Sequence, residues 1–114
     1  MMERSPQPAL QDIVEAIARI RGKLATTTLP EFEADWEMRW MAERGTEITS
    51  EASRRLPNAL KDRHPDIPWN KVAGIENVLR HEYDEVSARI LWAIFHHDLP
   101  PLEKACREEL EKLR

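Results

Sequence analysis

Apolar residues recur at intervals of three and four along almost the whole chain, and this spacing most constrains the fold. Such spacing places apolar side chains on one face of an α-helix. No stretch alternates apolar and polar residues with a period of two for more than a few residues, so strands are not expected. The pattern predicts an all-α, up-and-down bundle of four main helices with additional short helices.

Prolines and hydroxyl side chains mark the ends of the predicted helices in the first half of the chain. A first helix is expected from about Pro8 to Leu24. The segment Thr28–Glu31 matches a capping box with a proline in the first turn, which predicts a short helix. A long helix is expected from about Asp35 to Leu56, and Pro57 ends it.

The second half of the chain contains a proline-rich connection and further helices. Residues Asn58–Pro68 predict a loop with one turn inside it, because a residue before proline avoids helical geometry. Apolar spacing predicts helices at Trp69–Tyr83 and at about Ser87–His96. We expect Asp98 to cap a last helix whose first turn contains Pro100-Pro101.

Length and composition narrow the class of protein. The 114 residues predict one domain spanning 1–114, and the net charge of −4 lacks the bulk basic character of many nucleic-acid-binding proteins. The longest apolar run, Ile90–Phe95, is far below the ~20 residues of a membrane span. A single cysteine, Cys106, and an N-terminus without an apolar signal core favour a reducing cytoplasm. The three scattered glycines exclude a P-loop or Rossmann fingerprint.

The densest polar cluster lies on the predicted helix at Trp69–Tyr83. Helical spacing places Asn77 and His81 on one face, and Glu76, Arg80 and Tyr83 on another. An imidazole beside a guanidinium and a phenol is suited to general acid–base chemistry next to a bound phosphate. The same residues also fit a solvated helix end with a Glu76–Arg80 ion pair, and the spacing leaves both readings open.

Other candidates have plainer explanations. Arg44, followed by Glu47, is either a cation that reaches a cleft or a member of a surface ion-pair row, and composition favours the surface row. His96-His97 lack metal-ligand spacing relative to His81 and Cys106, so no metal site and no cofactor is predicted. At least three of the four tryptophans are expected to pack in the core or at a dimer interface. They are Trp36, Trp40, Trp69 and Trp92.

The segment His64–Tyr83, HPDIPWNKVAGIENVLRHEY, resembles the HepT-like toxins of the HEPN superfamily. The resemblance extends to the stretch from Arg44 to Ser53, similar to a family helix with an EI-x-EA pattern, and to Asp98–Leu102. It therefore covers nearly the whole chain. It implies an HEPN-like helical homodimer whose cleft holds a metal-independent endoribonuclease site. It also implies an MNT-type nucleotidyltransferase antitoxin as a partner.

The family motif carries over residue by residue. The motif histidine corresponds to His81, the tyrosine to Tyr83 and the polar residue after the arginine to Asn77, whereas the arginine position holds Glu76. The resemblance implies that the antitoxin transfers AMP to Tyr83. Arg80, directly before His81, is the expected replacement for the missing cation, with Arg44 as further support.

Two hypotheses follow from the sequence. The first is an RNA-cleaving toxin in which His81 is the acid–base group, Arg80 binds phosphate, and Asn77 and Tyr83 orient groups. The second is a HEPN module impaired in catalysis by Glu76, which binds a nucleotide or a nucleotidyltransferase partner. Arg44, Glu47 and Glu76 are supporting candidates under the first hypothesis.

Overall fold

The computed structural model describes residues 5–80 and 84–114. Within these ranges every regular element is helical, which confirms the predicted all-α class. The elements in chain order are α1 (Gln7–Leu24), α2 (Leu29–Ala34), α3 (Trp36–Arg54), α4 (Asn58–Asp62), α5 (Trp69–Ala73), α6 (Ile75–Arg80), α7 (Asp84–Ala93), the π-helix η1 (Ile94–Asp98) and α8 (Leu99–Lys112).

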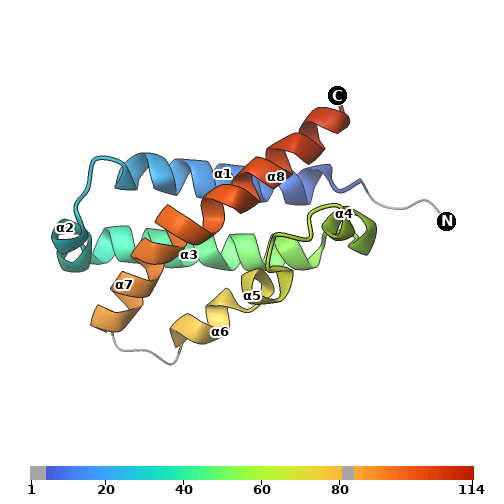
Figure 1. Ribbon diagram of the computed structural model, residues 1–114. Coiled ribbons are helices and arrows are strands. Elements are labelled where there is room, and N and C mark those ends of the chain that lie inside the picture. Colours follow the sequence, from blue (N-terminus) through green and yellow to red (C-terminus); the bar gives the residue numbers. More distant parts are fainter. Residues whose placement is uncertain (1–4, 81–83) are drawn as a thin grey trace.

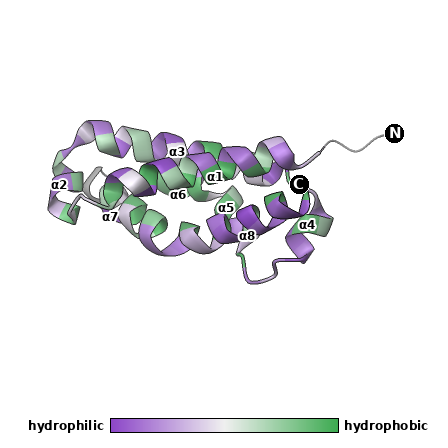
Figure 2. Ribbon diagram, turned by 90° about the horizontal axis from the view of Figure 1, so that it is seen from above, coloured by the Kyte–Doolittle hydropathy of each residue, from purple (hydrophilic) through white to green (hydrophobic). Residues whose placement is uncertain are grey.

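The helices form an elongated bundle of 48 × 28 × 23 Å (Figure 1). Helices α1 and α3 run antiparallel and side by side, and the α7–η1–α8 rod crosses both obliquely. Helices α5 and α6 pack along α3, with α2 near one end of the bundle and α4 near the other. Each long helix in Figure 2 contains both hydrophilic and hydrophobic residues, as expected for amphipathic helices that share one core.

The predicted stripe of α1 is buried and forms one wall of the core. Leu10, Ile13 and Ile17 are fully shielded from solvent. They belong to the same cluster as Phe32 of α2 and Phe95 of η1. Among the described residues no helix is long and apolar enough to cross a membrane.

The buried face of α3 is built from small residues rather than from its tryptophans. These residues are Ala42, Gly45, Thr46, Thr49, Ser50, Ala52 and Ser53. Trp36 and Trp40 lie outside this face, and their side chains are 53% and 64% exposed. Small side chains bring α3 close to α1: a Cβ added to Gly45 would overlap the side chain of Ile20.

The predicted capping box at the start of α2 is confirmed in both directions. The backbone N–H of Glu31 donates to Thr28 Oγ1 at 3.3 Å, and the backbone N–H of Thr28 donates to Glu31 Oε1 at 3.0 Å. Asp35 then caps α3 by accepting a hydrogen bond from the Met38 N–H at 3.1 Å. The predicted turn inside Asn58–Pro68 corresponds to α4.

The expected continuous helix at Trp69–Tyr83 is interrupted at Gly74. The dihedrals of this residue, φ −105° and ψ 6°, leave the helical region. Its N–H still bonds the Lys71 carbonyl, but the next helical hydrogen bonds belong to α6. The chain therefore forms two short helices that meet at a bend.

The predicted cap at Asp98 is also wrong. Its side chain makes no capping hydrogen bond, because α7, η1 and α8 follow one another without a free helix start. Pro100 and Pro101 lack the N–H groups that a helix interior uses, and the wider π turn precedes them. The His96 ring lies within hydrogen-bond distance of the Trp92 carbonyl, with Nδ1 at 2.8 Å from the oxygen.

Candidate functional site

Helix α6 carries the described part of the motif. Asn77 is exposed on this helix, and Arg80 is its last residue. His81 and Tyr83 lie outside the described residues, as does the side chain of Arg80. The geometry of the predicted acid–base group and of its cation therefore stays a prediction.

Glu76 pairs with a residue of another helix, which the spacing along its own helix does not predict. Arg54 of α3 donates from Nη2 to Glu76 Oε1 at 3.2 Å. The two side chains are 50% and 25% exposed, so the pair lies at the edge of the α3–α6 contact. The residue at the motif-arginine position is thus tied to a cation from another helix. The only sequence signal was an arginine near the end of the predicted long helix.

The same turns of α3 hold the end of α5. Ser50 donates from Oγ to the Val72 carbonyl at 2.7 Å, and Arg54 Nη1 donates to the Ala73 carbonyl at 2.8 Å. The last carbonyls of a helix have no partner within the helix. Ser50 and Arg54 therefore complete the hydrogen bonding of α5 where it meets Gly74.

A small hollow lies between α3 and α6. Its volume is about 200 Å³, and it is lined by Glu43, Thr46, Glu47, Glu76 and Leu79. The structure thus brings two of the supporting candidates, Glu47 and Glu76, to one place. Three carboxyl groups line this hollow, and two of them, those of Glu47 and Glu76, are paired with Arg44 and Arg54.

The third supporting candidate belongs to a surface ion pair. Arg44 Nη1 donates to Glu47 Oε2 at 2.9 Å, and both side chains are exposed. This is the surface pairing that composition favoured, and such exposed pairs contribute little to stability. Arg44 also borders a different depression, between α1 and α3, of about 340 Å³.

The tryptophans divide into two groups. Trp69 is partly buried, and its indole N–H lies 3.1 Å from the carbonyls of both Lys61 and His64. Trp92 packs against the core. Trp36 and Trp40 instead contact each other edge-to-face on the surface, with ring centroids 4.9 Å apart. Within one chain, two of the four tryptophans pack inside, so the predicted interface role of the other two stays a prediction.

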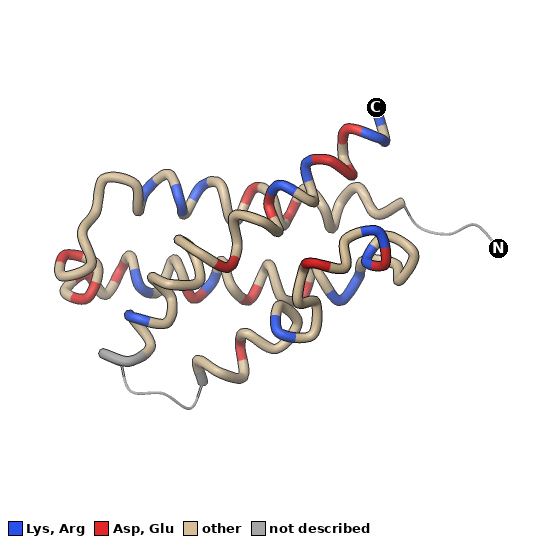
Figure 3. The backbone as a smooth tube through the Cα atoms, viewed as in Figure 1, with Lys and Arg blue, Asp and Glu red and all other residues tan. Residues whose placement is uncertain are grey.

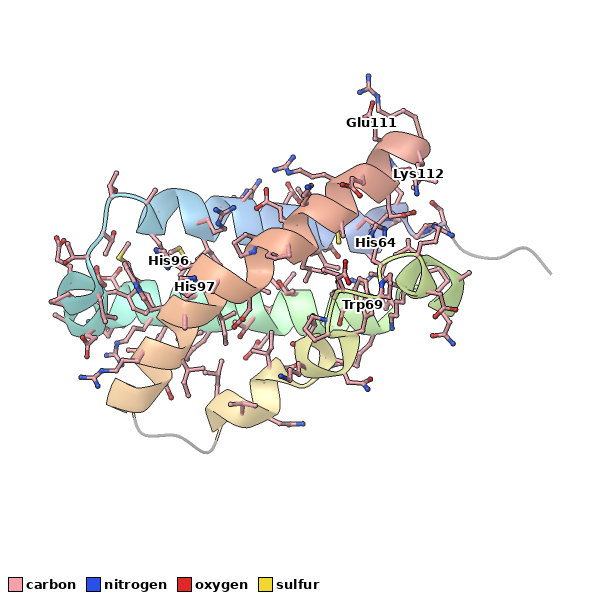
Figure 4. All side chains as sticks on the ribbon, viewed as in Figure 1. His64, Trp69, His96, His97, Glu111 and Lys112 are labelled. Atoms are coloured by element: carbon pink, nitrogen blue, oxygen red, sulfur yellow. The ribbon has the colours of Figure 1, made fainter. Side chains whose placement is uncertain are left out.

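The described histidines are spread over the molecule. His64 lies beside Trp69 near one end, whereas His96 and His97 lie at the π-helix (Figure 4). Within residues 5–80 and 84–114, no three His, Cys, Asp or Glu side chains gather in a metal-binding arrangement. Positive and negative charges are interspersed along the described helices (Figure 3).

The most strongly perturbed titratable groups lie on α8. Hydrogen bonds, the largest from Arg63 and others from His64 and Lys112, lower the pKa of Glu109 to about 2, although burial opposes this shift. Burial, with the charges of Glu109 and Glu103, raises the pKa of the Cys106 thiol to about 12. Cys106 is 1% exposed and packs as a small core residue.

Comparison with known proteins identifies the family. The family described as ribonuclease HepT-like matches residues 13–109. A protein named "Probable ribonuclease HepT" from Thermococcus cleftensis is 36% identical over 113 residues, which cover 99% of each chain. A relative provisionally named an RNase from Caldanaerobacter subterraneus subsp. tengcongensis is 30% identical over 109 residues, covering 96% of this chain and 97% of the relative.

A third relative, from Methanocaldococcus jannaschii, also carries a provisional RNase name. It is 30% identical over 104 residues, which cover 91% of this chain and 95% of its own. No solved structure matches the chain. The family match spans most of the sequence and includes α3, α5, α6 and the bend at Gly74. The chain therefore belongs to the HepT-like ribonuclease family.

Proposed function

We propose that this protein is the endoribonuclease toxin of a toxin–antitoxin pair, and that it cleaves RNA without a metal at a cleft of its homodimer. Membership of a ribonuclease family over residues 13–109 is the observation that carries RNA cleavage itself. The motif resemblance in His64–Tyr83 supports the finer parts of the proposal.

The proposed reaction is an internal transesterification. The ribose 2′-oxygen attacks the adjacent phosphorus, its proton passes to His81, and the bond from phosphorus to the 5′-oxygen breaks. The His81 of a second copy protonates the departing oxygen, which leaves a 2′,3′-cyclic phosphate and a 5′-hydroxyl. Arg80 stabilises the charge on the phosphoryl oxygens, and Asn77 and Tyr83 orient the substrate.

A homodimer is the proposed assembly, because it supplies two acid–base groups to one cleft. The exposed Trp36–Trp40 pair supports it, since paired aromatics of this size on a small surface are typical of interaction sites. A cytoplasmic location fits the single buried cysteine. The proposed antitoxin is an MNT-type nucleotidyltransferase that silences the toxin by adding AMP to Tyr83.

An alternative is a HEPN module that binds a nucleotide or a nucleotidyltransferase without cleaving RNA. The observation that favours it is Glu76 at the motif-arginine position, where a carboxylate paired with Arg54 stands in place of a phosphate-binding cation. A site without that cation lacks a charge that stabilises the phosphoryl group during cleavage.

Cleavage of labelled RNA by the purified wild type and by His81→Ala, with EDTA present, separates the two functions. The ribonuclease proposal expects wild-type products with cyclic-phosphate and 5′-hydroxyl ends and at least a hundredfold slower cleavage by His81→Ala. If neither the wild type nor His81→Ala cleaves RNA although both are folded, the binding module would remain as the proposed function. Growth arrest on expression without an antitoxin tests the toxin role.

A further inference from the structure

The bend at Gly74 depends on contacts from α3. Helices α5 and α6 have five and six residues, and helices this short are not stable by themselves. Ile75 and Leu79 pack α6 against the core, which fixes its distance from α3. Apolar contacts are not directional, so a hydrogen bond across the bend defines the orientation of α6 more closely than its apolar packing does alone.

Arg54 makes that directional contact on both sides of the bend. Nη1 bonds the Ala73 carbonyl at the end of α5, and Nη2 bonds the Glu76 carboxylate in the first turn of α6. Ser50 holds only the α5 side, through Val72. A planar guanidinium fixes the relative direction of its two partners, which a single ammonium does not. The Glu76 carboxylate is also favourable at a helix start.

We propose that Arg54 is a positioning residue for RNA cleavage, acting through Glu76 to set the rotation and direction of α6. This inference rests on the ribonuclease function proposed above. Glu76 occupies the position of the motif arginine in the sequence, and its carboxylate accepts the hydrogen bond from Arg54 of α3. Helix α6 rises about 6 Å from Glu76 to Arg80, so a small rotation at its start displaces the groups at its end. Displacements of about 1 Å at a reacting group reduce rates up to about a hundredfold.

Arg54→Met tests the proposal, with Arg55→Met as the matched control. Arg55 follows directly in the sequence, is 47% exposed and forms a 2.9 Å ion pair with Asp12 of α1. Both substitutions remove one cation and one ion pair. We expect Arg54→Met to lower kcat for RNA cleavage about 10- to 100-fold with KM changed less than about twofold, and Arg55→Met to change neither by more than about twofold.

The conservative variants Glu76→Gln and Arg54→Lys separate the effect of the hydrogen-bond geometry from the effect of charge. Glu76→Gln keeps an oxygen that accepts the Arg54 hydrogen bond, so kcat is expected to stay within about threefold of wild type. Glu76→Met removes the acceptor and is expected to lower kcat as Arg54→Met does. Arg54→Lys keeps the charge without the fork and is expected to recover only part of the rate. A rise in KM with unchanged kcat for Arg54→Met would mean that Arg54 binds RNA directly, and the proposal would be overturned.

Hydrogen exchange of the α6 amides provides a readout that does not depend on activity. Arg54→Met is expected to speed exchange at residues 77–80 at least tenfold, whereas Arg55→Met leaves it unchanged. If the wild type cleaves no RNA, the proposed function fails. The claim that Arg54 orients α6 is tested separately: it is overturned if Arg54→Met leaves hydrogen exchange of the α6 amides unchanged. If Arg54→Met does not fold, the same measurements on Glu76→Met test the proposal, because this variant leaves the Arg54–Ala73 hydrogen bond in place.

Discussion

Arg63 donates a 2.6 Å hydrogen bond from Nη2 to Glu109 Oε1, which joins the end of α4 to α8 across 46 residues of sequence. The Glu109 carboxylate is 3% exposed and also lies 2.7 Å from His64 Nε2 and 3.1 Å from Lys112 Nζ. An ionised carboxylate only accepts hydrogen bonds, so His64 donates from Nε2. This cluster holds the proline-rich connection that leads into α5 against the last helix.

Glu109→Gln is expected to destabilise the fold by about 2–3 kcal/mol at pH 7, because it removes the charge that three donors share. Urea unfolding measures this change. Glu108→Gln, at an exposed neighbouring position on α8, is the control and is expected to stay within about 0.5 kcal/mol of wild type. Equal stabilities of the two variants would contradict a structural role for the cluster.

The contribution of Glu109 should depend on pH in a defined window. Its pKa is lowered from 4.5 to about 2 in the folded protein, so its stabilisation is complete above the unfolded value and is lost as the pH falls towards 2. The lowering corresponds to about 3 kcal/mol. The difference in unfolding free energy between wild type and Glu109→Gln should therefore shrink between about pH 5 and pH 2. A difference that is constant over this range would contradict the lowered pKa of Glu109 as the source of this stabilisation.

Glu76→Arg is expected to reduce RNA cleavage, because it sets a second guanidinium against Arg54 and breaks their hydrogen bond. Arg80→Ala is expected to abolish cleavage if Arg80 supplies the cation at the phosphate. Rates on one labelled RNA for these variants and wild type check both statements. If the missing motif arginine itself disables the protein, Glu76→Arg would instead raise the rate by roughly 30- to 1000-fold, or about 2–4 kcal/mol.

Tyr83 is expected to accept AMP from a cognate nucleotidyltransferase. Incubation with the enzyme and ATP, followed by intact mass measurement, should show the added AMP on wild type and none on Tyr83→Phe. The modified protein should cleave RNA more slowly than the unmodified protein. Undiminished addition to Tyr83→Phe would place the modification elsewhere.

The double substitution Trp36→Ala/Trp40→Ala is expected to weaken the homodimer at least tenfold while changing the stability of the single-chain fold by less than about 1 kcal/mol. Both rings are exposed in one chain, so little core packing is lost. Light scattering over a concentration series measures the dimer, and Leu113→Ala at another exposed apolar side chain is the control. A wild-type mass of one chain at all micromolar concentrations would remove the dimer proposal.

Cys106 is expected to resist thiol reagents in the native protein at pH 8. Its side chain is buried, and its pKa of about 12 leaves almost no thiolate. Labelling with a thiol-reactive dye should become fast only in denaturant. Fast labelling of the folded protein would show that the α8 core opens readily.

Local patterns in the sequence were sufficient for much of the fold. The three- and four-residue spacing of α1, the hydroxyl–carboxylate pair of the capping box and the helix-ending Pro57 act over a few residues, so their outcome can be read from neighbours in the chain. The family followed from a contiguous motif. The bend at Gly74 could not be predicted because one glycine is also tolerated within a helix, and the hydrogen bonds from Ser50 and Arg54 that support the interrupted form come from another helix.

The helical class, most helix positions and the HepT-like family can thus be predicted from the sequence, because they depend on short-range periodicity, local hydrogen bonds and a contiguous motif. Packing of the helices determines three further outcomes: Trp36 and Trp40 face outward, Glu76 pairs with Arg54, and Glu109 binds Arg63 and His64. Each of these outcomes joins residues on different elements or depends on which helix face meets another helix. Spacing along one chain carries no information about such encounters until the helices are packed.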